Sequence, residues 1–189
     1  MKITDKKGLF MQMHPGYFDQ AYIRALSPER VFEEMTLDLH AFSCDQVAIP
    51  MPQGITFGMF PGGDMSGLLH SVRQVGEGWV QYFGESDDIF CAFDGDQVVS
   101  FCLLDDMGEH LLDGRKVRVA GPGCVGTIPA YRKRGIGLRM VQLGTQILKD
   151  RGYDISYIHF TGVGPWYAKL GYETLLTWNS VGIIDSEPV

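Results

Sequence analysis

The chain has 189 residues, of which 45% are hydrophobic and 21% charged, a balance typical of one globular domain with a sizeable buried core. Its net charge of −7 opposes the phosphate backbone of nucleic acid, so the composition argues against a general DNA- or RNA-binding role. The sequence has neither a run of roughly eighteen apolar residues nor an apolar signal-peptide core after residues 1–7, which predicts a cytoplasmic protein with no membrane partner.

Residues 1–50 show no strand-like alternation, and we expect an N-terminal helical extension there, packed on a core at about residues 55–189. The two parts are expected to form a single domain, residues 1–189. Ser27, Pro28 and Glu29 occupy positions typical of an N-cap, a first helical residue and an acidic first turn. Apolar residues follow, so the pattern predicts a capped helix over residues 27–39.

A loop, a helix and a short helical turn are predicted next. Prolines and glycines make residues 50–64 a loop, interrupted by a short strand around residues 55–59. Asp64 or Ser66 then caps a helix whose apolar residues recur at helical spacing as far as residue 75. A further short helix is expected over residues 79–83.

The second half of the chain has the pattern of a hairpin followed by a strand–helix–strand unit. Strands at residues 89–93 and 98–104 flank an Asp-Gly turn, and a second Asp-Gly precedes a strand over residues 116–128. A helix over residues 136–151 leads to a strand at 155–160, which predicts a parallel pair with a right-handed crossover. A short helix over residues 165–170 and one or two strands over 173–184 follow.

Glycines and basic residues gather where the strand at 116–128 turns into the next helix. Gly121, Gly123 and Gly126 weaken that strand unless the backbone bulges or a ligand approaches closely. Residues 132–137 read Arg-Lys-Arg-Gly-Ile-Gly, and a helix N-terminus there offers unpaired N–H groups to an anion. The turn therefore predicts a diphosphate site, with a basic turn whose glycines serve only the bend as the alternative. Seven of the 16 basic residues lie between positions 115 and 139, which also suggests a small anionic ligand.

The segment from Gly126 to Gly137 resembles the acetyl-CoA motif of the GNAT N-acetyltransferase superfamily. Residues 166–172, Trp-Tyr-Ala-Lys-Leu-Gly-Tyr, resemble the second signature of that family, in the right order and at the right separation. The resemblance implies a mixed α/β fold, a twisted mixed sheet with antiparallel N-terminal strands and a splayed parallel pair flanked by helices. It also implies acetyl-CoA as the acetyl donor. No metal is expected, because the four cysteines lack paired metal-ligand spacing.

A rival motif overlaps this region. Residues 121–126 match G-x-G-x-x-G, the dinucleotide-binding fingerprint, which needs a following helix and an acidic residue at the end of the next strand. Residues 127–129 instead continue as a strand, and the next strand ends in His159 and Phe160 with no acid. The sequence therefore disfavours a nicotinamide or flavin dinucleotide site.

The family's binding residues transfer to this chain one at a time. By resemblance, residues 125–127 supply the backbone that pairs with the pantetheine arm, and residues 133–138 supply the pyrophosphate cradle through backbone N–H groups. The family commonly has an Asn after the strand that ends here at Phe160, where this chain has Thr161 as the candidate replacement. The cofactor-binding residues so implied are Val125, Gly126, Thr127, Arg132, Lys133, Arg134, Gly135, Ile136, Gly137 and Leu138.

By the same resemblance, Tyr167 is the candidate general acid, because a phenol stays protonated at neutral pH; a packing tyrosine is the alternative. The base is open between His159, the acids Glu85, Asp87 and Asp88, and a water relay. The expected reaction is direct transfer of the acetyl group to an amine, small molecule or peptide, in a ternary complex. A non-catalytic acyl-CoA sensor is the alternative function, and the resemblance allows a homodimer.

Overall fold

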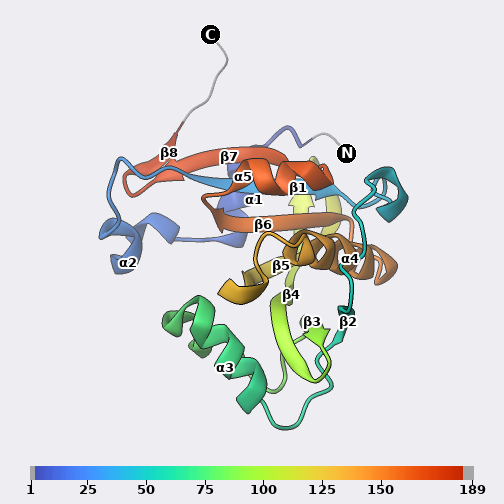
Figure 1. The fold of residues 1–189 in the computed structure, drawn as a ribbon. Coiled ribbons are helices and arrows are strands. Elements are labelled where there is room, and N and C mark those ends of the chain that lie inside the picture. The colour runs from blue at the N-terminus through green and yellow to red at the C-terminus, as the bar shows by residue number, and fades with distance from the viewer. Residues whose placement is uncertain (1–2, 185–189) are drawn as a thin grey trace.

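The computed structural model describes residues 3–184 and shows one eight-stranded mixed sheet (Figure 1). The strand order is β2-β3-β4-β5-β6-β1-β7-β8, and every neighbouring pair is antiparallel except β5 and β6. This sheet, flanked by helices, confirms the predicted mixed α/β fold with its parallel pair. The strands are β1 (Phe32–Asp38), β2 (Thr56–Met59), β3 (Ile89–Asp94), β4 (Gln97–Leu112), β5 (Arg115–Thr127), β6 (Ile155–Thr161), β7 (Glu173–Asn179) and β8 (Gly182–Ile184).

Helices cover both faces of the sheet. Ala120 and Ile158 pack in the core beneath α4 (Ile136–Asp150), whereas their chain neighbours Val119 and Tyr157 pack under the N-terminal segment on the opposite face. The helix α3 (Ser66–Val75) lies over β4 on that opposite face, where Leu103 belongs to the core beneath it. The other helical segments are α1 (Lys6–Met13), η1 (Tyr17–Asp19), α2 (Ala21–Arg24), η2 (Cys44–Gln46), η3 (Glu77–Tyr82), η4 (Pro129–Tyr131), α5 (Gly164–Tyr167) and η5 (Ala168–Leu170). None of the helices in the described range is long and apolar enough to span a membrane.

From β2 onward the elements lie where the sequence predicts them. Asp64 accepts a hydrogen bond from the Ser66 N–H (2.9 Å) just before α3. The second Asp-Gly turn has positive φ at both Asp113 (49°) and Gly114 (76°), the backbone shape that makes such dipeptides good hairpin turns. β4 extends eight residues beyond its predicted end at 104, because it continues to pair with β5 as far as Leu112.

The helix predicted over residues 27–39 is wrong. Ser27 begins a turn instead, with its C=O accepting from the Arg30 N–H (3.1 Å), and residues 32–38 form β1. β1 lies between β6 and β7, inside the sheet rather than packed on it. The capping residues favoured a helix locally, but pairing on both edges satisfies the backbone of this segment better than an isolated helix would.

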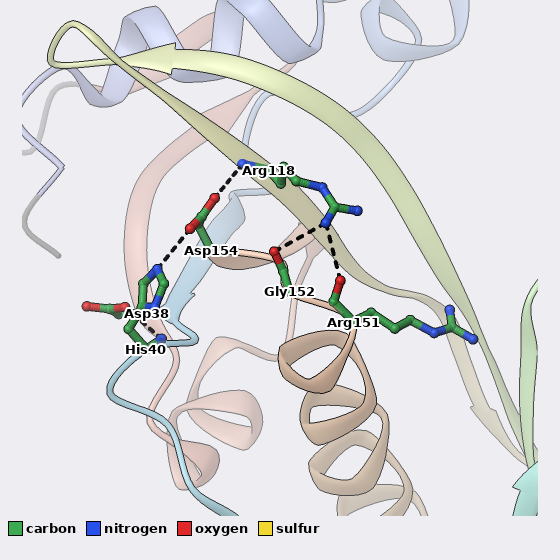
Figure 2. A network of polar contacts seen from close by, with 6 residues as sticks. All are labelled: Asp38, His40, Arg118, Arg151, Gly152 and Asp154. Carbon is green, nitrogen blue, oxygen red and sulfur yellow. Dashed lines mark hydrogen bonds and ion pairs between the residues drawn. The ribbon is translucent and has the colours of Figure 1, made fainter.

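A polar network fastens the parallel pair at one end (Figure 2). Asp154, just before β6, accepts from the Arg118 N–H of β5 (2.8 Å) and bonds the ring of His40 (2.8 Å). Burial alone would raise the pKa of Asp154, but these two hydrogen bonds outweigh it and hold that pKa below its usual range. Arg118 also donates to the carbonyls of Arg151 and Gly152 at the end of α4. β5, β6 and α4 are thus held together at this end of the sheet.

Candidate active site

The parallel pair separates almost as soon as it forms. β5 and β6 pair only at Val119–Ile155 and Ala120–Ser156, after which β5 continues beside β4 alone. A Cβ on Gly121 would lie 1.7 Å from the Tyr157 carbonyl oxygen, so glycine is required where the two strands part. The splayed pair implied by the resemblance is therefore present, and it leaves one edge of β5 open.

A bulge shapes that open edge. Cys124 and Val125 together face a single residue of β4, and Cys124 has a left-handed φ of 45°. The Ile128 N–H donates to the Val99 C=O (3.0 Å). Hydrogen-bonded and non-hydrogen-bonded pairs alternate along an antiparallel ladder, so the next pair, Thr127 with Ser100, is a non-hydrogen-bonded one. The N–H and C=O of Thr127 therefore point away from β4, toward the gap.

Gly126 packs toward β4, unlike the residues on either side of it. Its carbonyl accepts from the Ser100 hydroxyl (2.6 Å) on β4, and a Cβ there would lie 2.5 Å from the Phe101 ring. Gly126 thus makes room for β4 rather than facing the gap. Of the three β5 residues proposed to pair with a pantetheine arm, Thr127 presents its backbone most plainly.

The turn after β5 exposes a row of backbone N–H groups. Lys133 and Gly135 have left-handed φ values of 62° and 77°, and Gly135 is the N-cap of α4. The first hydrogen bond of the helix runs from the Arg139 N–H to the Gly135 C=O (3.0 Å), so residues 136–138 have no carbonyl partner within the helix. A Cβ on Gly137 would lie 2.9 Å from Thr127 Oγ1, so this residue keeps the cradle close to β5.

The basic side chains are less concentrated than the sequence suggests. Arg115 begins β5 and Arg118 belongs to the network at the fastened end, whereas residues 132–134 follow the other end of the same strand. Arg132 Nε donates to the Thr127 C=O (3.0 Å), and Arg134 stacks on the Tyr131 ring at 4.8 Å. The positive charge available to an anion at the turn therefore comes from residues 132–134 and the helix N-terminus.

A cleft of about 690 Å³ lies on the face opposite α4. Met13, His14 and Tyr22 of the N-terminal segment line one side of it, and Trp79 and Tyr82 of η3 line the other. It reaches the splay, because its lining includes the open edge of β5 and the end of β6. The remaining lining residues that matter for chemistry are Asp105, Cys124, Val125, His159, Thr161 and Tyr167.

The turn at residues 132–137, called the phosphate turn below, and the splay lie within the segment that matches a known family. The model of the acetyltransferase (GNAT) domain family matches residues 65–175, more than half of the chain. The chain belongs to the GNAT family. Among curated proteins, no match is found.

Solved structures of GNAT proteins share the fold. The GCN5-related glucosamine N-acetyltransferase region of a fungal multi-domain β-N-acetylglucosaminidase aligns with a TM-score of 0.66 at 21% identity, covering 78% of this chain and 20% of that one. A GCN5-related N-acetyltransferase from Sphaerobacter thermophilus aligns with a TM-score of 0.58 at 21% identity, over 90% of this chain and 53% of that one. One from Kribbella flavida gives 0.56 at 17%, over 86% and 62%. The chain thus spans less than two thirds of each of these structures.

Tyr167, the GNAT-type general acid candidate, borders the cleft. Its side chain is buried, and burial raises the pKa of the phenol well above 10. The described residues provide no hydrogen-bond partner for its hydroxyl, which leaves that group free to donate into the cleft. Thr161, the candidate replacement for the family's Asn, accepts from the Val163 N–H (3.1 Å) in the same region.

His159 is held by a carboxylate from the N-terminal strand. Glu34 is fully buried, and its Oε1 accepts from Trp178 Nε1–H (2.7 Å) and from the Phe160 N–H (3.2 Å). His159 Nδ1 lies 2.9 Å from Glu34 Oε2, and the His159 side chain is 28% exposed in the cleft. Sequence reasoning named His159 as a candidate base but missed Glu34, since residues 27–39 were expected to be helical.

The N-terminal segment also encloses the imidazole of His159. The ring of His14 stacks on it at 4.1 Å between centroids, with 18° between planes, and Tyr17 approaches edge-on at 5.2 Å. Burial, and next the neighbouring His159, lower the pKa of His14 to about 4, so His14 is neutral at neutral pH. Two of the side chains that pack against the His159 ring, His14 and Tyr17, therefore come from residues before β1.

The acids named from the sequence lie elsewhere, and another acid lines the cleft. Asp88 pairs with Arg151 (2.7 Å), and Asp87 accepts from the Gly84 N–H (2.5 Å), both near the surface. Asp105 of β4 lines the cleft without a hydrogen-bond partner in the described range, and burial, then Asp87, raise its pKa. No pattern in the sequence pointed to Asp105, because this residue lies just beyond the predicted end of its strand at residue 104.

Within residues 3–184, one group of side chains brings potential metal-ligand atoms close enough to share an ion, namely His14, Glu34 and His159. Glu34 already accepts three N–H groups, and the Nδ1 of His159 must carry a proton to donate to it. The set is therefore a hydrogen-bonded cluster, and the absence of a metal remains a prediction. A second hollow, of about 440 Å³, lies beside Leu37, Phe42 and Leu170, and neither Tyr167 nor the phosphate turn lines it.

Proposed function

We propose that this GNAT protein transfers the acetyl group of acetyl-CoA to an amine acceptor by direct attack in a ternary complex. The observation that carries the proposal is that two binding features of different character meet at one place. The first turn of α4 carries a row of N–H groups without helical partners, and an aromatic cleft lies on the other face, with the splay between β5 and β6 joining them.

The residues at the turn suit a diphosphate. The N–H groups of Ile136, Gly137 and Leu138 lack helical partners, and the two left-handed residues Lys133 and Gly135 curl the chain around the site. The N–H of Thr127 faces the gap, where it would donate to an amide carbonyl of the pantetheine arm, while its C=O accepts from Arg132 Nε. Bound there, acetyl-CoA supplies an acetyl thioester as the electrophile.

The chain's own groups then have separate tasks. The open backbone around Val125 offers N–H groups to the carbonyl oxygen as negative charge develops on it, which is worth most in a site shielded from water. Tyr167 donates its proton to the departing sulfur, because its raised pKa keeps the phenol protonated through the physiological range. A basic group must take a proton from the acceptor nitrogen, since an amine with a pKa of about 10 is almost entirely charged at pH 7.

Direct transfer is favoured over an acetylated enzyme. Cys124 is the thiol in the cleft, and burial, followed by the charge of Asp105, raises its pKa to about 11. At neutral pH it is therefore a protonated thiol and a poor nucleophile. No hydrogen bond from a basic side chain activates it in the described structure.

The cleft suits an amine attached to an apolar, aromatic or sugar group. Its walls carry Tyr22, Trp79 and Tyr82, and Asp105 is a carboxylate without a partner. We propose a small-molecule or peptide amine as the acceptor, in the cytoplasm, without nucleic-acid or membrane partners and without a metal. A homodimer is part of the same proposal.

Release of free thiol from acetyl-CoA, measured across a panel of amines, tests the proposal. The panel contains 2-phenylethylamine, glucosamine, spermidine and a lysine peptide, with mass spectrometry of the acetylated product. Amine-dependent thiol release with one acetylated product supports the enzyme. Tight coenzyme A binding without thiol release would leave only a sensor, and absence of binding would remove the acetyl-CoA assignment altogether.

A further inference from the structure

We infer that His159 is the general base of the reaction and that Glu34, from the N-terminal strand, is the residue that positions it. The inference rests on the proposed function and adds the group that this function needs but that the family motif does not supply. Nothing in the phosphate turn or the Tyr167 signature identifies either residue. The two lie 125 positions apart in the chain and meet because β1 inserts beside β6.

Glu34 fixes the tautomer of the imidazole. A carboxylate only accepts hydrogen bonds, and Glu34 also accepts from Trp178 Nε1–H and the Phe160 N–H. His159 must therefore carry its proton on Nδ1. The lone pair is then on Nε2, the atom on the far side of the ring, and no hydrogen bond occupies it among residues 3–184.

The position of the ring suits proton removal. His159 lines the same cleft as Tyr167, so a base and an acid border the place where the acceptor must meet the thioester. His14 covers one face of the ring and Tyr17 packs against it in a T-shaped contact, and the exposed part of the side chain lies at the cleft. The remaining freedom of the imidazole is small, as efficient proton transfer requires.

The backbone around Glu34 and His159 is strained. His159 and Phe160 together oppose Glu34 in a β-bulge, and Phe160 has a left-handed φ of 55°, which is strained for a bulky residue. The Glu34 carboxylate accepts the N–H of that strained residue (3.2 Å). Burying a carboxylate on a central strand is unfavourable unless its hydrogen bonds are complete, and here both oxygens are engaged. Strain and a buried charge on the same residues favour function over packing.

The protons balance with two groups. An ammonium loses two protons on becoming an amide. His159 Nε2 takes one and passes it to solvent through the cleft, which leaves a neutral nitrogen to attack the acetyl carbon. The second ends on the sulfur, delivered through Tyr167 as the carbon–sulfur bond breaks. While His159 carries the extra proton, the Glu34 carboxylate stabilises the positive ring.

Other titratable groups surround the ring and bear on any pH profile. Glu34 lies at Nδ1, His14 and Tyr17 flank the ring from the N-terminal segment, and Tyr157 precedes it on β6. Asp105 borders the same cleft from β4. His14 stays neutral above about pH 5, because its pKa is about 4, and the pKa values of both tyrosines are raised well above 10 by burial.

The experiment compares His159→Gln and Glu34→Gln in the full chain, using acetyl-CoA and the best amine of the panel. Glu34→Gln keeps the shape and the bonds from Trp178 and Phe160, but its amide N–H faces Nδ1 and moves the imidazole proton to Nε2. We expect kcat to fall by about a hundredfold or more in His159→Gln and by about tenfold to a hundredfold in Glu34→Gln. The double variant should be no slower than His159→Gln alone. Coenzyme A affinity should stay within about threefold in all of them.

His40→Gln is the matched control. His40 also bonds a carboxylate, Asp154 at 2.8 Å, but it lies in the network at the fastened end and does not line the cleft, so its removal should leave kcat unchanged. Long-range ¹H–¹⁵N NMR of the free protein gives a readout independent of activity. It should show a protonated Nδ1 in the natural chain and a protonated Nε2 in Glu34→Gln.

Three results overturn the inference. The first is a natural chain with the proton on Nε2, the second is a His159→Gln variant whose kcat stays within about threefold, and the third is an equal loss of kcat in His159→Gln and His40→Gln. If Glu34→Gln fails to fold, the tautomer of the natural chain and the His159→Gln rate still decide. If the natural chain releases thiol and the variants are equally active, His159 is not the base but the proposed function stands. If no amine gives thiol release, the proposed function fails as well.

Discussion

The two faces of the sheet differ in what they offer a ligand. On the α4 side, the proposed cofactor site consists of backbone groups of one short segment, the N–H row at residues 136–138 and the open edge at Thr127. On the opposite side, the cleft is assembled from side chains of distant segments, such as His14, Trp79 and His159. A backbone cradle tolerates changes in most side chains, so it suits a ligand common to a whole family. A side-chain cleft changes with each substitution, and it is therefore where a GNAT protein can become specific for one acceptor.

The largest expected effect breaks the backbone side alone. Gly135→Glu places a carboxylate at the N-terminus of α4, where it occupies the proposed site and repels the diphosphate. We expect coenzyme A affinity to fall by about a hundredfold or more. No atom lies within 4 Å of the added Cβ, so the side chain fits, although φ is 77° and any non-glycine residue is strained there. Isothermal titration calorimetry with coenzyme A is the measurement.

Gly135→Gln is the control for that strain. It has the same size and suffers the same left-handed backbone penalty of about 1 kcal/mol, but it carries no charge. The glutamate variant should bind coenzyme A at least about tenfold more weakly than the glutamine variant. Equal affinities in two folded variants would mean that the turn does not hold an anion.

The same contrast explains what could be predicted from the sequence. The turn at residues 132–137 was accessible because glycines, basic residues and a helix start are local signals, and the structure places a helix N-cap at Gly135. β1 was not accessible, because Ser27 and Pro28 signal a helix while the true partners of residues 32–38 are two strands more than 100 positions away. Glu34 and the walls of the cleft depend on that docking, and no local pattern encodes it.

The second prediction separates a catalytic tyrosine from a structural one. Tyr167→Phe removes a hydroxyl that has no partner in the described structure, so stability should change little while kcat falls by about tenfold to a hundredfold. Tyr172→Phe is the contrast, since its hydroxyl bonds Thr145 (2.8 Å) and Ser156 (2.7 Å) in the core. It should lower the free energy of unfolding by about 1–3 kcal/mol and leave kcat unchanged.

The pH profile refines this test. Because burial raises the pKa of Tyr167 above its usual value of about 10, the phenol stays protonated as the pH rises through that value. Any loss of rate caused by its deprotonation is therefore expected only at higher pH, and the two enzymes should differ by a constant factor below about pH 10. A phenylalanine variant with the natural kcat, where chemistry limits turnover, would return Tyr167 to a packing role.

The smallest expected effects distinguish backbone from side chain at Thr127. Thr127→Ala removes a hydroxyl that bonds Ser100 Oγ (2.8 Å), which costs about 1 kcal/mol of stability, and coenzyme A affinity should stay within about threefold.

Thr127→Pro removes the N–H as well. That N–H points away from β4, so the β4–β5 ladder should survive the substitution and the fold with it. Affinity for coenzyme A should then fall by about tenfold, the loss expected for one hydrogen bond, as measured by calorimetry alongside thermal unfolding. Thr127→Val adds a shape-matched variant without the hydroxyl and should behave like alanine or better. If all three substitutions weaken binding equally while the protein stays folded, the side chain carries the contact, and the open edge of β5 is not the surface on which the pantetheine arm lies.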